Sequence, residues 1–214
     1  MRWQAIVSTA LIGMAVLSAR AQNQDEASRL YIGLDLGRSH LGLGGGDIDN
    51  VFLNQGATTV TSTANSNTAT GLIAGYRVNR HFAVEGAYAH LGNFAYNSVV
   101  TAPAADTIQG SFRANALSLS AVGIVPLPAS WSIYGKLGLA YTVSTLSANS
   151  VSGVTPLSNG TESTTGLLAG AGATYDFNTT WFGKLGWDHY TSVGGATTGK
   201  GYFNVLSLGA GMRF

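Results

Sequence analysis

The sequence predicts an all-β protein, an eight-stranded antiparallel up-and-down transmembrane β-barrel. Three observations predict this fold. Segments with a strict two-residue alternation recur along the chain, and only 10% of the residues are charged although 29 are glycine and the mean hydropathy is +0.18. Beyond the N-terminal leader, no apolar stretch approaches the about 18 residues that a membrane-spanning helix needs. Strands that alternate between lipid and lumen give high hydropathy without such a helix.

The C-terminal segment Tyr202 to Phe214 shows the alternation most clearly. One face is apolar, whereas the other carries glycine, serine and Arg213. Because a face of glycine, serine and arginine cannot form a hydrophobic core, we expect the apolar face to lie against lipid and the small polar face to line the lumen. A soluble ligand-binding barrel of the lipocalin kind is the rival fold, and the inverted faces argue against it. The apolar face consists of Leu206, Leu208, Ala210, Met212 and Phe214.

The N-terminus has the pattern of a secretory signal peptide. Arg2 supplies a positive start, Ala5 to Leu17 is mostly apolar, and Ala19-Arg20-Ala21 matches an A-x-A cleavage site. A buried N-terminal helix is the alternative. We expect residues 1–21 to be removed and residues 22–214 to form one outer-membrane β-barrel domain. The absence of cysteine excludes a lipoprotein attachment site, a disulfide framework and a thiolate metal site.

Four alternating segments make up the first half of the expected barrel. In the first of them, Leu34 and Leu36 flank Asp35, so leucine and aspartate face opposite sides. In the third, Val84 precedes Glu85 with the same consequence. Most segments have about the 9–11 residues with which a tilted strand crosses a bilayer. The four are Leu30 to His40, Thr70 to Val78, Phe82 to Leu91 and Arg113 to Val125.

Four further segments complete the barrel in the same alternation. Leu137 follows Lys136 in the fifth, and Asp188 follows Trp187 in the seventh. In each case the apolar residue is expected against lipid and the charged residue in the lumen. The four are Trp131 to Ser144, Gly166 to Phe177, Trp181 to Tyr190 and the C-terminal segment.

The connections alternate between short and long, and this predicts the orientation. Outer-membrane barrels keep short turns on the periplasmic side and long loops outside, so an even strand number places both termini at the periplasmic rim. The short turns are Asn79 to His81, Pro126 to Ser130 and Asn178 to Thr180. The long connections are about Gly42 to Ala69, Gly92 to Ser111, Leu146 to Thr165 and Thr191 to Lys200.

Outward-facing aromatic residues sort by strand end, as the two girdles of a membrane barrel do. Scattered core aromatics would show no such order. The girdle beside the short turns is expected to contain Tyr76, Phe82, Trp131, Tyr175, Phe177, Trp181 and Phe214. The girdle at the opposite strand ends is expected to contain Tyr88, Tyr141, Trp187 and Tyr202.

With these motifs the chain resembles the OmpA-like eight-stranded outer-membrane β-barrel family. The resemblance rests on residues 71–79, 82–88, 136–141 and 209–214 and covers essentially the whole mature chain. It implies a Gram-negative cell outer membrane. The chain departs from the many relatives that carry a periplasmic peptidoglycan-binding domain after the barrel, so we expect a barrel alone, without a cell-wall anchoring role. The resemblance also implies that the barrel-assembly machinery, as a transient partner, reads the terminal strand through Leu208, Ala210, Met212 and Phe214.

Eight charged side chains are expected to point into the lumen, four of each sign. Buried charges pair or keep water, because isolated charge in an apolar surrounding is very costly. Arg77 and Glu85 flank one tight turn on the same face and are expected to be cross-strand or diagonal neighbours. The network predicts a salt-bridge plug, and a gated ion-conducting path is the alternative. The eight are Asp35, Arg77, Glu85, Lys136, Asp176, Lys184, Asp188 and Arg213.

The histidines raise an enzyme hypothesis, since some outer-membrane barrels are enzymes. His40, His90 and His189 fall at the loop ends of strands and face outward by phase, towards lipopolysaccharide head groups, while His81 lies in a short turn. No serine–histidine–acid or paired-acid arrangement converges with them, so we expect no enzyme, metal site or cofactor. Arg38, at the same rim, could contact lipid phosphate.

The sequence therefore predicts an integral outer-membrane protein with a structural, envelope-integrity or surface-interaction role. A small porin-like channel for ions or minor solutes is the alternative, and an outer-membrane enzyme is the least favoured. The partners expected are outer-membrane lipid and lipopolysaccharide. A net charge of +1 argues against nucleic acid. The long connections, rich in Ser, Thr, Asn and Gly, suit surface loops, but their composition names no ligand.

Overall fold

The computed structural model describes residues 29–42, 58–63, 66–102, 106–150, 160–195 and 199–214. Within these ranges the chain forms strands joined by short turns. The expected signal peptide, residues 1–21, lies outside the described residues. The strands are β1 Leu30–Leu41, β2 Thr58–Thr63, β3 Ser66–Arg77, β4 Phe82–Ala102, β5 Asp106–Pro126, β6 Trp131–Ser150, β7 Gly160–Asp176, β8 Trp181–Gly195 and β9 Gly199–Arg213.

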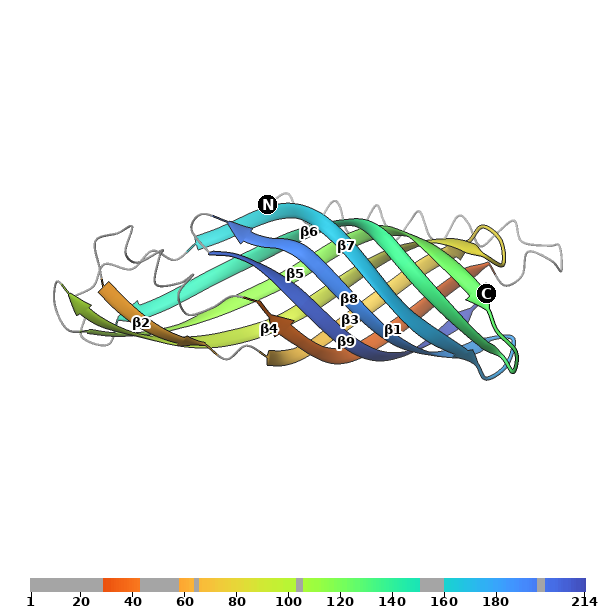
Figure 1. Cartoon of the computed structure of the whole chain (residues 1–214), viewed down its shortest axis with the longest axis horizontal. Helices are drawn as coiled ribbons and strands as arrows, with labels where there is room; N and C mark the ends of the chain where they lie inside the picture. The colour runs from red at the N-terminus through yellow and green to blue at the C-terminus, as the bar shows by residue number, and fades with distance from the viewer. Residues whose placement is uncertain (1–28, 43–57, 64–65, 103–105, 151–159, 196–198) are drawn as a thin grey trace.

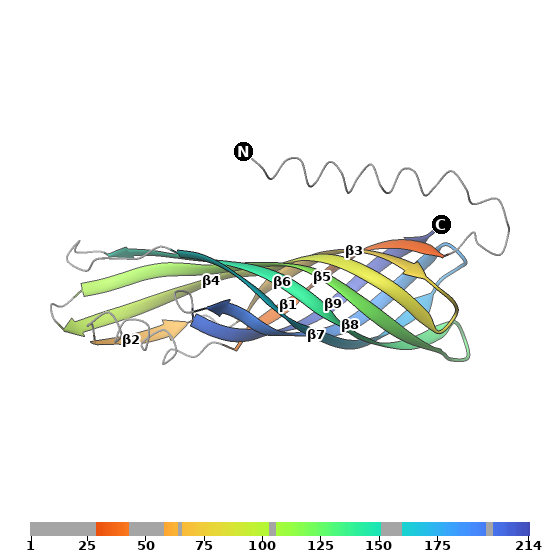
Figure 2. The ribbon, with the colours of Figure 1, turned by 90° about the horizontal axis from the view of Figure 1, so that it is seen from above.

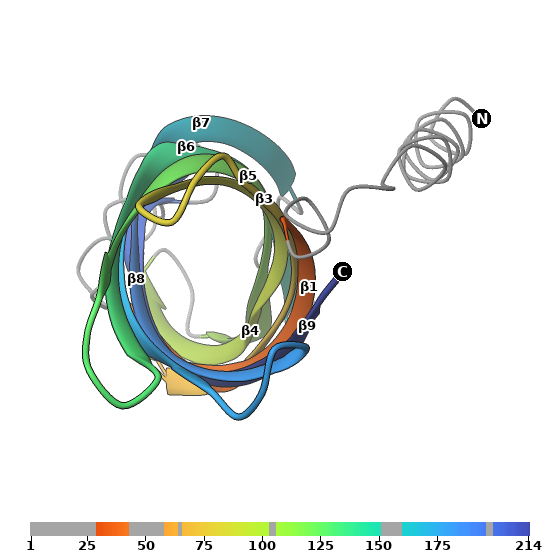
Figure 3. The same ribbon diagram turned by 90° about the vertical axis from the view of Figure 1, so that its right-hand side faces the viewer.

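Eight of these strands close into one antiparallel barrel, which confirms the predicted fold. The hydrogen-bonded order runs β4-β3-β1-β9-β8-β7-β6-β5, and the pairing of β4 with β5 closes the ring. Every strand pairs antiparallel to its neighbours, and Figure 3 shows the closed ring along the barrel axis. The described part of the chain contains no helix long and apolar enough to span a bilayer.

The strands start and stop evenly at one end of the barrel and unevenly at the other. At the end with the short turns, the strand boundaries agree with the predicted ones within one residue. At the opposite end, which we call the loop end, β4, β5 and β6 extend far beyond β1 and β3 (Figures 1 and 2). The strand β2, six residues long, pairs with β4 on this extension alone.

The four connections predicted as long loops are wrong in extent, because each contains strand. β2 and the start of β3 lie in the first, the ends of β4 and β5 in the second, and the ends of β6 to β9 in the others. The ladder between β4 and β5 continues from Asn93↔Arg113 to Val100↔Asp106. Beyond the apolar band, towards the loop end, the outward residues are mostly polar, so a search of the sequence for apolar outward faces ends the strands too early.

The alternation of β4 changes phase where it leaves the apolar band. Leu91 and Gly92 are both buried, and the ladder with β5 shifts between His90 and Gly92. Gly92 has φ +116°, a conformation that L side chains rarely adopt, as in a β-bulge built on glycine. The bulge turns Phe94 into the interior.

Two short turns use the same asparagine device. The side-chain Oδ1 of Asn79 accepts hydrogen bonds from the backbone N–H groups of His81 and Phe82, at 2.7 and 2.9 Å. Asn178 Oδ1 accepts from Thr180 and Trp181 in the same way, at 2.9 and 2.7 Å. An asparagine that bonds its own backbone two residues on stabilises such a turn.

The outward face of the barrel is apolar over a central band. Leu137, 71% exposed, and Leu34, 68% exposed, lie in this band, which no protein segment of the described chain covers. Both groups of predicted girdle residues are exposed at the two ends of the band except Tyr175, which is half-buried between Trp131 and Phe177. This is the inverted surface expected of a barrel that faces lipid.

Candidate functional site

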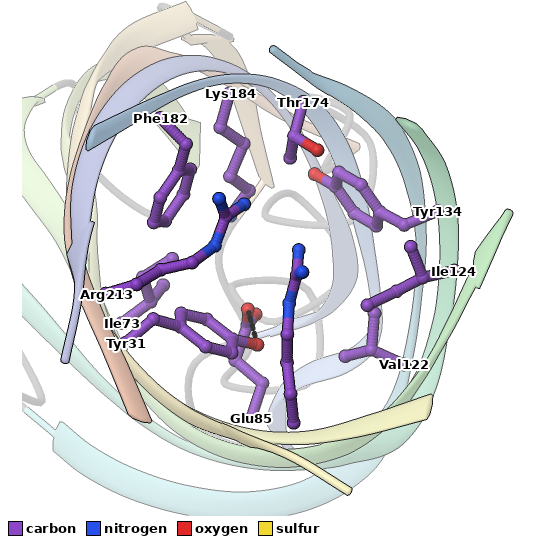
Figure 4. Close-up of a pocket in the computed structure, with 11 residues that line it drawn as sticks. Tyr31, Ile73, Glu85, Val122, Ile124, Tyr134, Thr174, Phe182, Lys184 and Arg213 are labelled. Atoms are coloured by element: carbon purple, nitrogen blue, oxygen red, sulfur yellow. Dashed lines mark hydrogen bonds between the residues drawn. The ribbon is translucent and has the colours of Figure 1, made fainter. Parts of the chain in front are cut away.

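The eight charged residues that the alternation placed in the lumen lie on the inward face of the half of the barrel beside the short turns. Five of them meet in the middle of the lumen. At the rim beside the short turns, Arg213 Nη2 lies 2.6 Å from Asp176 Oδ1, and the guanidinium of Arg213 stacks over the Phe182 ring at 4.7 Å. Arg77 lines the cavity between the rim and the middle, and Figure 4 shows the side chains that surround this cavity.

The central charges form two groups of contacts, which we together call the lumen network. Lys136 Nζ lies 3.4 Å from Glu85 Oε1 and 3.0 Å from Asp188 Oδ2, so one ammonium bridges two carboxylates. Lys184 Nζ lies 2.9 Å from Asp35 Oδ2. The network consists of Tyr31, Asp35, Glu85, Lys136, Lys184 and Asp188.

The lumen network links every second strand of the ring into a closed circuit. The hydroxyl of Tyr31 on β1 donates to Glu85 Oε2 on β4 at 3.0 Å, and Lys136 on β6 joins β4 to β8. Lys184 on β8 returns to Asp35 on β1. Each contact therefore spans the lumen over one intervening strand and none joins two neighbouring strands.

The intervening strands make room for this circuit with small inward residues. Gly209 is paired with Asp35 and Gly170 with Asp188, and a methyl group added at either glycine would collide with the carboxylate opposite. Gly75 lies beneath the Tyr31 ring in the same way. Alternating large and small inward residues is how small barrels fill a narrow interior.

The interior around the network is nearly filled. A cavity of about 40 Å³ lies towards the short turns, beside Tyr134, and one of about 30 Å³ lies beside Asp35 and Asp188. Each has room for only a few water molecules. Within the described residues four buried polar atoms have no hydrogen-bond partner, and they are Asp35 Oδ1, Tyr134 OH, Asp188 Oδ1 and Arg213 Nε.

Above the network the lumen is closed by apolar side chains, which the sequence analysis did not anticipate. The rings of Phe94 and Phe112 lie 5.4 and 6.4 Å from that of Phe203, and all three side chains are buried. We call this group the upper apolar cluster. Its larger members are Leu41, Leu91, Phe94, Ile108, Phe112, Leu146, Leu168, Tyr190, Val193, Phe203 and Val205.

Arg77 and Glu85 are diagonal neighbours, as predicted, because the register pairs Arg77 with Ala83 and Gly75 with Glu85. Glu85 nevertheless makes its contacts with Tyr31 and Lys136. No described ion pair joins it to Arg77. The ion-pair partner of Glu85 is therefore not the charge that flanks the same turn. The curvature of the closed sheet brings the inward side chains of β4 and β6 together.

Sequence reasoning missed the inward aromatic residues of the lower lumen. Tyr31, Tyr134 and Phe182 point into the barrel, where Tyr31 meets Phe182 edge-on at 6.0 Å (Figure 4). A signal was present, because each shares the phase of an inward charge on its own strand and pairs with a glycine across the ladder. These aromatic residues were missed because the inward faces were expected to carry only small and polar residues.

The histidines are dispersed on the outer surface. His90 Nδ1 lies 2.8 Å from Asn115 Oδ1, and His189 Nδ1 lies 2.8 Å from Asn204 Oδ1. His40 Nδ1 lies 3.3 Å from Ser66 Oγ. The described residues include no group of three His, Asp or Glu side chains placed to hold a metal ion.

The expected assembly signal lies on the outer face of β9. Leu208 and Ala210 are exposed there, Met212 is half-exposed, and the backbone N–H of Phe214 donates to the carbonyl of Leu30 at 2.8 Å. The last residue is thus bonded to the first strand at the seam between β1 and β9.

Comparison with known proteins gives a family and a set of similar folds. A family model described as an outer membrane protein beta-barrel domain matches residues 9–214. No curated protein matches the sequence significantly.

Three solved structures illustrate the likeness. Neisserial surface protein A has 15% identity and a TM-score of 0.55, covering 86% of this chain and 97% of its own. Ail, the attachment invasion locus protein of Yersinia pestis, has 16% identity and a TM-score of 0.52, with 87% and 99% covered. The outer membrane protein OprG from Pseudomonas aeruginosa has 16% identity and a TM-score of 0.52, with 88% and 97% covered. At these identities the likeness shows the fold.

Proposed function

The chain belongs to the outer membrane protein β-barrel family, and from that premise we propose that it is a structural barrel of the outer membrane whose lumen is plugged by charge. Its short turns, the start of β1 and the C-terminus face the periplasm, and its extended strands face the cell exterior. We assign it a role in envelope integrity, with a surface for interactions on the extension.

The observation that carries the plug is the double bridge made by Lys136. Its ammonium is within ion-pair distance of both Glu85 and Asp188, and only 2% of its side chain is exposed. Opening a path for ions would separate these charges inside a lumen with space for a few waters, which is costly. The upper apolar cluster adds a second barrier that hydrated ions cross poorly.

Planar-bilayer conductance tests the plug. We expect no steady channel current from the wild-type barrel. Lys136→Met removes the bridging charge and should give channel openings that the wild type does not show. Arg113→Gln is the matched control, because Arg113 is an exposed charge on the outer face of the extension. Reproducible wild-type channels that vanish when Glu85 or Lys136 is neutralised would overturn the proposal.

A small ion channel is the second candidate, favoured by the two cavities that lie on either side of the network. The network holds three carboxylates, from Asp35, Glu85 and Asp188, and two ammonium groups, from Lys136 and Lys184. If it conducts, the excess negative charge favours cations. Reversal potentials in a salt gradient measure this preference, and an anion preference would exclude a path through the network.

The terminal strand supports a proposal about assembly. We assign its outward residues and Phe214 as the segment that the barrel-assembly machinery reads. Deletion of Phe214 should lower the amount of folded barrel in the outer membrane, measured by heat-modifiable gel mobility, while in vitro folding into detergent stays efficient. Equal loss in both settings would mean that Phe214 acts on stability alone.

A further inference from the structure

The barrel wall is split between β7 and β8 at the loop end. Their ladder ends at Leu168↔Tyr190, although β7 continues to Gly160 and β8 to Gly195. Over the same height β7 stays paired with β6, and β8 stays paired with β9 after a register shift between Tyr190 and Val193. The split is therefore a local feature of one seam.

A side chain replaces the backbone ladder at the start of the split. The hydroxyl of Thr191 accepts from the backbone N–H of Leu167 at 2.9 Å and donates to the Leu167 carbonyl at 3.2 Å. Further up, Thr164 Oγ1 donates to the Gly194 carbonyl at 2.7 Å. Threonine hydroxyls thus hold the two strands where backbone groups no longer do.

Above this point β8 passes to the lumen side of β7. A Cβ at Gly166, which shares the inward phase of Leu168, would meet the backbone nitrogen and oxygen of Ser192 at 3.0 and 3.1 Å. Val193 follows, is fully buried and belongs to the upper apolar cluster. The end of β8 therefore tucks into the barrel mouth and leaves a notch in the outer wall.

This notch is a hollow of about 630 Å³, within the range of small-molecule sites. Its lining combines hydroxyl groups with aromatic rings and contains no charged side chain among the described residues. The residues around it are Gly42, Thr164, Thr165, His189, Thr191, Ser192, Val193, Gly194, Gly201 and Tyr202.

Several polar groups of the notch are available to a ligand. The structure records no side-chain hydrogen bond for Thr165, Ser192 or Tyr202, all of them exposed. His189 lines the notch and uses Nδ1 towards Asn204, so its Nε2 is left for another partner. The His189 ring lies 5.4 Å from that of Tyr202 and 6.0 Å from that of Trp187, so a short aromatic wall borders the hydroxyls.

We propose that this notch is a binding site for a neutral saccharide unit. Hydroxyls that both donate and accept match the hydroxyls of a sugar, and an aromatic wall offers an apolar face with polar edges to a pyranose ring. The described residues of the lining carry no charge, and a neutral lining of this kind favours a neutral ligand over a phosphate or carboxylate. The site is on the outer wall and does not rest on the plugged lumen.

Two sources present this chemistry at the height of Trp187 and Tyr202, which mark the upper aromatic girdle. One is the sugar portion of an outer-leaflet glycolipid, and the other is a free oligosaccharide from outside the cell. Both would reach the notch from its open side, because Val193 closes the lumen side.

Methyl NMR of the full-length barrel in phosphatidylcholine nanodiscs tests the site. Threonine methyl labelling reports on Thr165 and Thr191 in the notch, with Thr107, exposed on the extension, as internal reference. The probes are a neutral hexose oligosaccharide of the lipopolysaccharide outer core, free of phosphate and acidic sugars, and intact rough lipopolysaccharide incorporated into the nanodisc, which presents the same hexoses. We expect the notch signals to shift with at least one probe while Thr107 stays unchanged.

Matched tyrosine variants separate recognition from folding. Tyr202→Phe combined with Ser192→Ala should weaken binding roughly tenfold or more, because two hydroxyl contacts are lost. Tyr141→Phe is the control, since Tyr141 and Tyr202 are both 44% exposed on the outer face. Shifts with free oligosaccharide support an aqueous glycan, and shifts with intact lipopolysaccharide alone support a glycolipid. No shift with either probe, or equal weakening by both sets of variants, would overturn the proposal.

Discussion

The membrane half and the extension of the same strand obey opposite rules. On β6, Lys136 points inward and Leu137 outward in the membrane half, whereas in the extension Leu146 is buried inside and Asn149 is exposed outside. The alternation continues without a break in the β5–β6 register between them. The difference teaches that period two sets the faces, while the medium outside decides which face is apolar.

The interior changes with the exterior. Beside lipid the lumen holds ion pairs and glycines together with a small apolar group that includes Val122 and Ile124, and towards the loop end it is filled by apolar side chains such as Phe94 and Phe112. In the membrane half the bilayer removes the apolar outer side chains from water, so the lumen can be polar. In the extension, where water lies outside, apolar side chains are removed from water only by packing in the interior.

Removing the bridging charge should have the largest effect on the membrane half. Lys136→Ala leaves Glu85 and Asp188 buried without their shared ammonium, and breaking a buried pair in this way costs about 4 kcal/mol. Guanidinium unfolding of the barrel in phospholipid vesicles measures the loss. Arg113→Ala, an exposed charge of the extension, should change stability little. A loss below about 1 kcal/mol for Lys136→Ala would show that the network is wet and weakly coupled.

An aromatic truncation should be nearly as costly in the extension. Phe112 is 3% exposed and stacks near Phe203, so Phe112→Ala is expected to destabilise the barrel by about 3 kcal/mol through lost burial and a new cavity. Val99→Ala, on the exposed face of β4, is the control. The same unfolding titration compares them, and equal effects would mean that the upper apolar cluster packs loosely.

A charge placed outward should separate the two halves directly. Leu137→Arg puts a cation into the apolar band and should cost about 2 to 3 kcal/mol. Asn149→Arg makes the same change on the outer face of the extension and should stay within about 0.5 kcal/mol. Urea-dependent folding into vesicles gives both values. Similar costs at the two positions would place the membrane boundary higher than the upper girdle.

A glycine pair around Asp35 gives the smallest and sharpest comparison. Gly209→Ala should cost about 1 to 2 kcal/mol, because its Cβ would overlap the Asp35 carboxylate and also lie too close to the backbone oxygen of Leu34. Gly71 flanks Asp35 on the other side, where a Cβ would make only ordinary van der Waals contacts, with Asp35 Cβ at 3.4 Å as the nearest atom, so Gly71→Ala should be close to neutral. Thermal unfolding in detergent ranks them, and the reverse order would mean that Asp35 leans towards β3.

Much of this fold could be predicted because membrane strands carry their information locally. Each short turn is marked by residues such as Asn79, and each outward face by residues such as Leu34, within one strand length. The inward phase of Glu85 and Lys136 follows from the same counting. No long-range information is needed for these features.

The ring of contacts could not be predicted from alternation, since partner choice depends on curvature and stagger of the closed sheet. Arg77 is nearer to Glu85 in sequence than Lys136 is, yet Lys136 makes the contact. For a different reason, the strands of the extension were not predicted. Their outer residues do not differ in composition from those of an ordinary loop. The signal for these strands lay on the inner face, in residues such as Ile108 and Phe112.

The contacts over intervening strands have a kinetic consequence. A flat sheet that contains β4, β5 and β6 keeps Glu85 and Lys136 two strands apart, and only curling brings their side chains together. We therefore expect these ion pairs to form last, after the sheet has paired and bent. Interactions absent from the folding transition state slow unfolding and leave the folding rate almost unchanged. The lumen network would thus act as a latch that sets how long a finished barrel lasts and has no part in how fast it forms.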